Sequence, residues 1–154
     1  GKDDPREALI KQMIKDLNYN GVEGKILMYS HFEKTMVATF IRDFPEYAKD
    51  LEKISDRLVD LAKPYRKHIH TEATQNTWSL KVVLPTFLPH LSYSDLDIQN
   101  GIQTMEVYRN LAEVKDVNQI DKQRKAMLAY CKLDTKAVLD LYNLLPKIAG
   151  TDNF

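Results

Sequence analysis

The chain has 154 residues, of which 44% are hydrophobic, so it is long enough to bury the core of a single domain. Its 22 basic and 22 acidic residues cancel, which excludes the long-range positive field of a strongly basic nucleic-acid-binding protein. Cys131 is the one cysteine, so no internal disulfide can form, and no apolar run is long enough to predict a membrane span. We therefore expect a cytoplasmic protein that makes no membrane contact.

The first predicted helix begins at Asp4 to Glu7, where a capping carboxylate, a first-turn proline and a glutamate three residues after the cap follow one another. Its apolar face is expected to contain Leu9, Ile10, Met13, Ile14 and Leu17. Residues 18–24 break this period with Asn and Gly. The apolar run from Lys25 to Tyr29 then predicts a short strand buried on both faces.

A second helix is expected from about His31 to Phe44, and a shorter one from Glu46 to Ile54. The apolar face of the second helix should contain Phe32, Met36, Val37 and Phe40. Arg57 to Leu61 is short enough to be a helical turn or a second strand, and as a strand it would pair in parallel with Lys25 to Tyr29.

The stretch from Pro64 to Thr77 is polar and has no period, which predicts a long surface loop. Its two histidines, His68 and His70, are expected to be solvated, because a pair at this spacing is more often solvated than bound to metal. A helix should follow from Trp78 to Phe87, and Pro89 to Asn100 is expected to be irregular.

Two amphipathic helices complete the prediction. Gly101 to Val114 should direct one face inward, formed by Ile102, Met105, Val107 and Leu111. The longest helix is expected from about Val117 to Ala149, with Gly150 as its stop. Its apolar positions are Met127, Tyr130, Leu133, Val138, Leu141, Leu145 and Ile148.

Tyr130 and Asp134 form a Tyr-x-x-x-Asp pattern inside the longest predicted helix, where this spacing places a phenol and a carboxylate on one face. About one such match is expected by chance, and a second copy, Tyr93 to Asp97, lies in the irregular segment, where the spacing fixes no common face. The plainer interpretation of the helical copy is a surface aspartate beside a core tyrosine.

Ser30 and Glu33 directly follow the predicted strand, at the strand end where open sheets with helical crossovers bind ligands. Ser-x-x-Glu is also the pattern of a capping box, which could explain both residues without a binding site. Both interpretations stay open.

Asp60 and Lys81 are two weaker candidates. Asp60 lies between apolar residues of a candidate strand, where a carboxylate needs partners to offset its desolvation, and a structural hydrogen-bonding role is expected. Lys81 lies near the start of a predicted helix, where free amides favour anions such as phosphate. A solvated lysine is the plainer interpretation.

Six spaced segments carry a resemblance when they are taken in order. They are Met28 to Glu33, Arg57 to Leu61, Ser79 to Pro85, Leu91 to Leu96, Ile98 to Gly101 and Tyr130 to Ala137. This order resembles a bacterial domain family of unknown function whose members look like 3′ to 5′ exonucleases of the DEDD type, in the tyrosine-bearing subgroup. The resemblance implies a helix-dominated α/β chain with a ribonuclease H-like fold.

The resemblance also implies a two-metal mechanism in which four carboxylates hold two Mg²⁺ or Mn²⁺ ions and a nucleic-acid phosphodiester is hydrolysed. Glu33 and Asp134 would be two of the metal ligands, and Tyr130 would orient the attacking water. Ser30, Asp60 and Lys81 would be supporting or phosphate-contacting residues. The chain departs from the pattern in having Glu at position 33 where most such enzymes have Asp, and Ser30 where Asn is frequent.

In this fold the first strand supplies an Asp-x-Glu pair. No such pair lies on a predicted strand before Lys25. We therefore expect a partial domain that lacks the first strands of its sheet and is inactive alone, although the complete domain would bind nucleic acid. A homodimer through the strand edge from Lys25 to Tyr29 is also expected. The alternative is a non-catalytic module that binds nucleic acid or protein on a degenerate nuclease fold.

Overall fold

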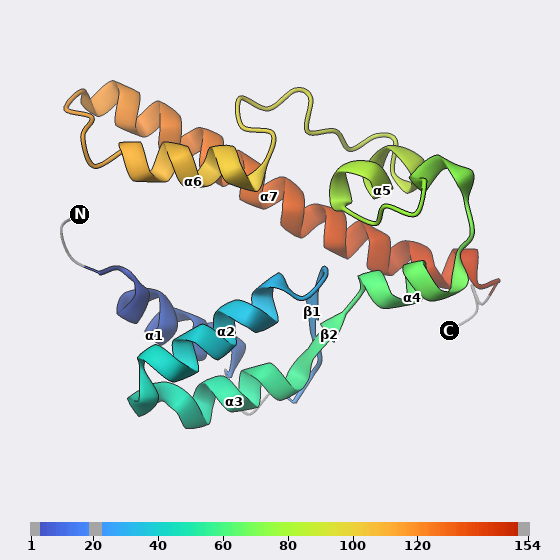
Figure 1. Ribbon diagram of the computed structural model, residues 1–154, viewed down its shortest axis with the longest axis horizontal. Coiled ribbons are helices and arrows are strands. Elements are labelled where there is room, and N and C mark those ends of the chain that lie inside the picture. Colours follow the sequence, from blue (N-terminus) through green and yellow to red (C-terminus); the bar gives the residue numbers. More distant parts are fainter. Residues whose placement is uncertain (1–3, 19–22, 151–154) are drawn as a thin grey trace. The chain divides into compact units, whose positions relative to one another are not determined.

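The computed structural model describes residues 4–18 and 23–150 (Figure 1). The chain divides into two compact units, Gly1–Ile69 and His70–Phe154, which we call the N-terminal and the C-terminal unit. Helices dominate both, and the only strands among the described residues form a small two-stranded parallel sheet. The expectation of a helix-dominated α/β chain is thus confirmed at this level.

In the N-terminal unit, each of the two strands follows a helix along the chain. Its elements are α1 (Arg6–Leu17), β1 (Ile26–Met28), α2 (Phe32–Asp43), the 3-10 helix η2 (Pro45–Tyr47), α3 (Ala48–Arg57), β2 (Leu58–Asp60) and α4 (Ala62–His68). β1 and β2 are parallel, with Ile26 opposite Leu58 and Met28 opposite Asp60. The two predicted strands and their parallel pairing are therefore confirmed. The predicted break at residues 18–24 lies partly outside the described residues.

The core of this unit lies where α1, α2 and α3 meet. Its buried residues are Ile10, Val37, Phe40 and Leu51. The prediction was wrong for Leu9 and Phe32, which are exposed, Phe32 by 65%. Leu9 precedes Ile10 by about 100° around the helix, and Phe32 lies in the first turn of α2, before that helix reaches the core.

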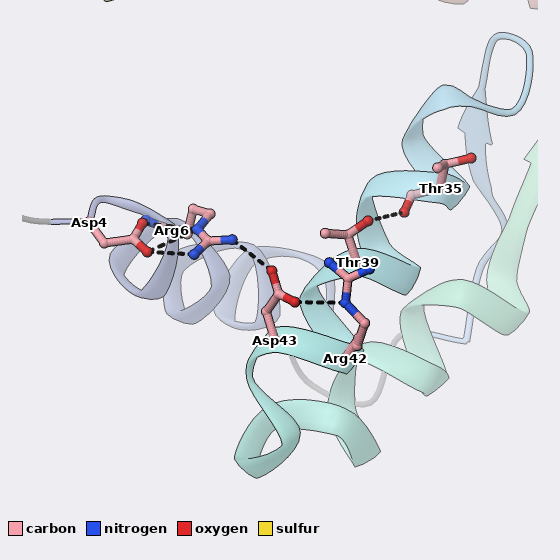
Figure 2. A network of polar contacts seen from close by, with 6 residues as sticks. All are labelled: Asp4, Arg6, Thr35, Thr39, Arg42 and Asp43. Carbon is pink, nitrogen blue, oxygen red and sulfur yellow. Dashed lines mark hydrogen bonds and ion pairs between the residues drawn. The ribbon is translucent and has the colours of Figure 1, made fainter.

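A polar network joins the start of α1 to the end of α2 (Figure 2). Arg6 donates to both Asp4 and Asp43, and Arg42 donates to Asp43 at 2.8 Å. Asp4 also accepts the Arg6 main-chain amide at 3.0 Å, which is the capping chemistry predicted for this helix start. Because these side chains are largely exposed, the ion pairs contribute little to stability and mainly orient the two helix ends.

The predicted loop from Pro64 to Thr77 was wrong, because α4 occupies its first part and the 3-10 helix η3 (Glu72–Thr74) a later part. Pro64 is the third residue of α4, in the first turn, where the missing amide hydrogen has no intrahelical partner to lose. The buried ring of Tyr65 and the buried methyl group of Ala62 anchor the helix, while its lysines, Arg66 and His68 are exposed. One buried aromatic residue is too little apolar signal for a periodicity argument.

The C-terminal unit is entirely helical in its regular structure. After η3 come α5 (Leu80–Phe87), α6 (Gly101–Asn110) and α7 (Val117–Ile148), and α5 packs against α7. Residues 88–100 contain no helix or strand, as predicted. Gly150 ends α7 with a φ of +68°, and this confirms the predicted glycine stop. Buried hydrophobic side chains of the unit are Val83, Leu84, Leu88, Leu91, Tyr93, Ile98, Ala137 and Leu141.

The predicted inward face of α6 was only half right. Val107 and Leu111 are partly buried, but Ile102 is 68% exposed and Met105 is also exposed. The buried face passes through Thr104, Val107 and Leu111. Ile102 and Met105 lie about 140° and 160° from Val107 around the helix, so they point away from that face. Ile148, at the end of α7, is exposed as well.

Candidate functional site

Tyr130 and Asp134 lie one turn apart in the middle of α7, and the structure brings their side chains together as the sequence predicts. The Tyr130 hydroxyl and the Asp134 carboxylate lie close enough for each to shift the pKa of the other. Both residues are partly buried. Apolar surroundings strengthen such an interaction and make an unpaired carboxylate costly.

A third residue, Tyr93, completes this site, and the sequence prediction missed it. The Tyr93 hydroxyl donates to Asp134 Oδ1 at 2.5 Å, and its ring lies 5.6 Å from the ring of Tyr130. Tyr93 belongs to the copy of Tyr-x-x-x-Asp that lies in the irregular segment before α6. That motif has no helical geometry of its own, but its tyrosine reaches the aspartate of the helical copy 41 residues later. We call Tyr93, Tyr130 and Asp134 the Tyr–Asp cluster.

The electrostatics of the Tyr–Asp cluster follow from burial. Burial raises the pKa of Asp134 above its ordinary value, although the hydrogen bonds from Tyr93 and Tyr130 oppose the rise. Burial, reinforced by the negative charge of Asp134, raises the pKa of Tyr130 to about 12. The phenol therefore stays protonated at neutral pH and acts as a hydrogen-bond donor, as a residue that orients water would need to do.

The turn between β1 and α2 carries the second group of candidates. Ser30 adopts a left-handed conformation with a φ of +71°, and Glu33 lies exposed in the first turn of α2. The N-cap of α2 is His31, whose side chain makes no capping hydrogen bond. Of the two interpretations left open, the capping box is therefore disfavoured, because a capping residue takes an extended conformation that Ser30 does not have.

Asp60 holds this turn in place. The residue is 6% exposed, and its two carboxylate oxygens accept three hydrogen bonds of 2.9 Å, from the Ser30 amide, the Ala62 amide and the Arg66 guanidinium. Two amides and one cation satisfy the buried charge. The predicted structural role of Asp60 is confirmed: it ties the ends of both strands together and fixes the turn that precedes Glu33.

Two tyrosines lie beside Asp60 in the same unit. Burial raises the pKa of Tyr29 well above its usual value and that of Tyr65 to about 12. The Tyr29 hydroxyl is buried and has no hydrogen-bond partner among the residues that the structure describes. An unpaired buried hydroxyl lowers the stability of the fold. Burial also disfavours the charged phenolate, so the ring stays protonated.

The remaining candidates are surface residues. Lys81 is exposed in the first turn of α5, and His68 and His70 are exposed, as predicted for solvated side chains. Within residues 4–18 and 23–150, no three His, Cys, Asp or Glu side chains form a group that could hold a metal ion. In the same ranges, no helix is both long and apolar enough to cross a membrane. Glu33 lies in the N-terminal unit and Asp134 in the C-terminal unit, and the structure fixes each within its own unit.

Comparison with known proteins gives one match. A family model with the description "Domain of unknown function (DUF2779)" matches residues 1–79, which is more than half of the chain. The matched range contains Ser30, Glu33 and Asp60 and ends before Lys81 and the Tyr–Asp cluster. Neither the comparison with curated proteins nor the comparison with solved structures gave a match.

Proposed function

The chain belongs to the DUF2779 family of domains of unknown function, and on this premise we propose that it forms part of a metal-dependent 3′ to 5′ exonuclease-like domain. The domain would have a ribonuclease H-like fold and would hydrolyse nucleic-acid phosphodiesters. The proximity of the Tyr130 hydroxyl to the Asp134 carboxylate on α7 is the observation that carries this proposal. A partly buried carboxylate with a raised pKa beside a protonated phenol is a combination that folding alone does not favour.

Each residue has a proposed role in the complete domain. In that domain Asp134 and Glu33 would each supply an oxygen ligand for a divalent ion, and Tyr130 would donate a hydrogen bond that orients the attacking water. Asp60 fixes the turn that carries Glu33 through its bond to the Ser30 amide. Lys81 is available for a phosphate contact because its side chain is exposed. Since the formal net charge is zero, contacts with nucleic acid would be local.

The residues of this chain fit Mg²⁺ or Mn²⁺ in chemistry but not in number. Carboxylate oxygens are the ligands that these hard cations prefer. Two dications about 4 Å apart repel by about 16 kcal/mol at an effective dielectric of about 20, and two carboxylates neutralise only half of their combined charge. The chain alone should therefore hold at most one ion, largely through water and at roughly millimolar concentration. Bound ions would supply a nucleophile at neutral pH and stabilise the leaving oxygen.

A paired nuclease assay tests the proposal. The 154-residue chain and the same chain extended N-terminally in its parent gene are incubated with Mn²⁺ and labelled single-stranded DNA or RNA. The extended protein should digest the substrate from its 3′ end, and the chain alone should not. Glu33→Gln and Asp134→Asn should each abolish digestion by the extended protein, whereas Glu52→Gln and Asp121→Asn, at exposed carboxylates of α3 and α7, should leave it intact.

A second candidate is a non-catalytic module that binds nucleic acid or protein. The observation in its favour is that the Tyr93 hydroxyl already donates to Asp134 and N–H groups already donate to Asp60, so both carboxylates have partners without an ion. If the extended protein contains the Asp-x-Glu pair and still digests neither substrate, the exonuclease proposal is refuted in favour of this module.

Self-association through β1 is also proposed. The sheet has the order β1–β2, so one edge of β1 is not paired within it. An apolar strand with such an edge favours pairing with another chain. Static light scattering should show a dimer that forms as protein concentration rises, and a monomer at every concentration would contradict the proposal.

A further inference from the structure

Tyr93 is the residue of the Tyr–Asp cluster that neither the sequence motifs nor the family match assigns a role. It lies in the irregular segment between α5 and α6 and is 8% exposed. Its hydroxyl oxygen lies 2.5 Å from Asp134 Oδ1, within the range of a charge-assisted O–H···O⁻ bond. A buried phenol that makes so short a bond to a carboxylate from a distant segment constrains that carboxylate strongly.

The two phenols do not constrain Asp134 in the same way. Tyr130 is on the same helix, one turn before the aspartate, so any helix with this spacing would bring the two side chains together. Tyr93 approaches from another segment and fixes the position of Oδ1 relative to residues outside α7. The tilted contact between the two rings, at 39°, holds the phenols on the same side of the helix.

A water-orienting role for Tyr130 requires its hydroxyl to donate to the water rather than to Asp134. A partly buried carboxylate without any hydrogen bond would bear the full cost of its desolvation. With Tyr93 in place, the carboxylate keeps a donor while the Tyr130 hydroxyl donates to the water. Tyr93 therefore leaves the Tyr130 hydroxyl available to the water.

We propose that Tyr93 is a positioning residue for the exonuclease-like site: it holds Asp134 by one oxygen, so that the carboxylate keeps one orientation while the Tyr130 hydroxyl is released to the attacking water. This inference rests on the proposed function. A purely structural alternative, in which Tyr93 only anchors the irregular segment, predicts the same hydrogen bond but no effect on turnover. The two can be separated by kinetics.

The first measurement tests the contact without any activity. In proton NMR spectra of the 154-residue chain, the Tyr93 hydroxyl should give a slowly exchanging downfield signal, because its bond is short and buried. The signal should be absent in Tyr93→Phe, shifted in Asp134→Asn and retained in Tyr130→Phe. Wild-type spectra without a signal that follows this pattern would overturn the inference, whatever the protein does to nucleic acid.

The second measurement uses the extended protein with Mn²⁺ and the labelled substrates. Tyr93→Phe keeps the ring and should lower kcat about tenfold, the effect of losing one hydrogen bond of ordinary strength, with KM unchanged. Tyr108→Phe, at an exposed tyrosine of α6, should match the wild type. An unchanged kcat, or a change in KM alone, would overturn the positioning role. An inactive wild type would instead refute the proposed function, and the positioning role with it, whereas the NMR signal would still report the contact.

Discussion

Asp60 offers the sharpest test of how the strand ends are held, because its two oxygens accept hydrogen bonds from different groups. Oδ1 accepts the Ser30 and Ala62 amides, and Oδ2 accepts Arg66. Three substitutions separate these contacts. Asp60→Ala removes all of them, Asp60→Asn keeps an oxygen for the amides but turns an NH₂ group toward the guanidinium, and Arg66→Met removes only the ion pair.

The expected losses of unfolding free energy differ in size. Asp60→Ala leaves two buried or partly buried amides unpaired at about 1–3 kcal/mol each, so a total of about 3–5 kcal/mol is expected. Arg66→Met should cost only about 0.5–1 kcal/mol, because the Arg66 side chain is 44% exposed and its ion pair is screened by water. Asp60→Asn should fall between them, at about 1–2 kcal/mol, since it opposes two donors.

Urea unfolding followed by far-ultraviolet circular dichroism measures these losses, provided that the slope with urea is the same for every variant. Asp56→Asn, at an exposed carboxylate of α3, is the matched control and should change stability by less than about 0.5 kcal/mol. The reasoning is refuted if Asp60→Ala costs under about 1 kcal/mol, or if Asp60→Asn costs as much as Asp60→Ala.

Three further predictions concern other parts of the chain. Burial raises the pKa of Asp134, so its contribution to stability is fully present below the ordinary pKa of 3.8 and is lost as pH rises through the folded value; Asp134→Asn should therefore stabilise the chain against urea at pH 7, and a gain of equal size below pH 3.8 would contradict this cause. Gly150→Ala should lower stability by about 1 kcal/mol in thermal unfolding, because Gly150 has a φ of +68°, and a smaller loss is expected for Gly150→Asn. In a spectrophotometric titration of the 8 tyrosines, Tyr65 and Tyr130 should ionise at about pH 12 and Tyr29 later still, whereas a single step near pH 10 would show that these rings are not buried.

The sequence predicted the fold best where local chemistry decides it. Lys25 to Tyr29 is an apolar run between breakers, and its strand formed with nearly the predicted bounds. Arg57 to Leu61 was open between strand and turn, because only pairing with β1 distinguishes them, and pairing is a tertiary contact. The α4 helix was missed for the opposite reason: its helical turns are stabilised by the burial of Tyr65 rather than by a repeating apolar pattern.

The Tyr–Asp cluster, too, could be predicted from local patterns only in part. The i, i+4 spacing of Tyr130 and Asp134 suffices to predict their contact on a helix. No spacing rule connects Tyr93 to Asp134, since an irregular segment and a helix separate them. The available signal was burial: Leu91 and Tyr93 alternate with the polar Ser92 and Ser94, and a buried tyrosine usually finds a partner for its hydroxyl.

Asp60, which is buried, and Asp134, which is partly buried, show that two carboxylates of one chain can have different roles. Main-chain amides and a guanidinium surround Asp60, so its charge is well stabilised by the fold, and its removal should destabilise the protein. Tyr93 and Tyr130 offer Asp134 only neutral hydroxyls, which offset burial incompletely, and its pKa rises. A carboxylate that lowers the stability of the fold when it is ionised suits a binding or catalytic role, because binding of a cation would restore the lost electrostatic energy. If Asp60→Asn lowers the free energy of unfolding at pH 7 and Asp134→Asn raises it, Asp60 has a structural role and Asp134 is available to bind a ligand.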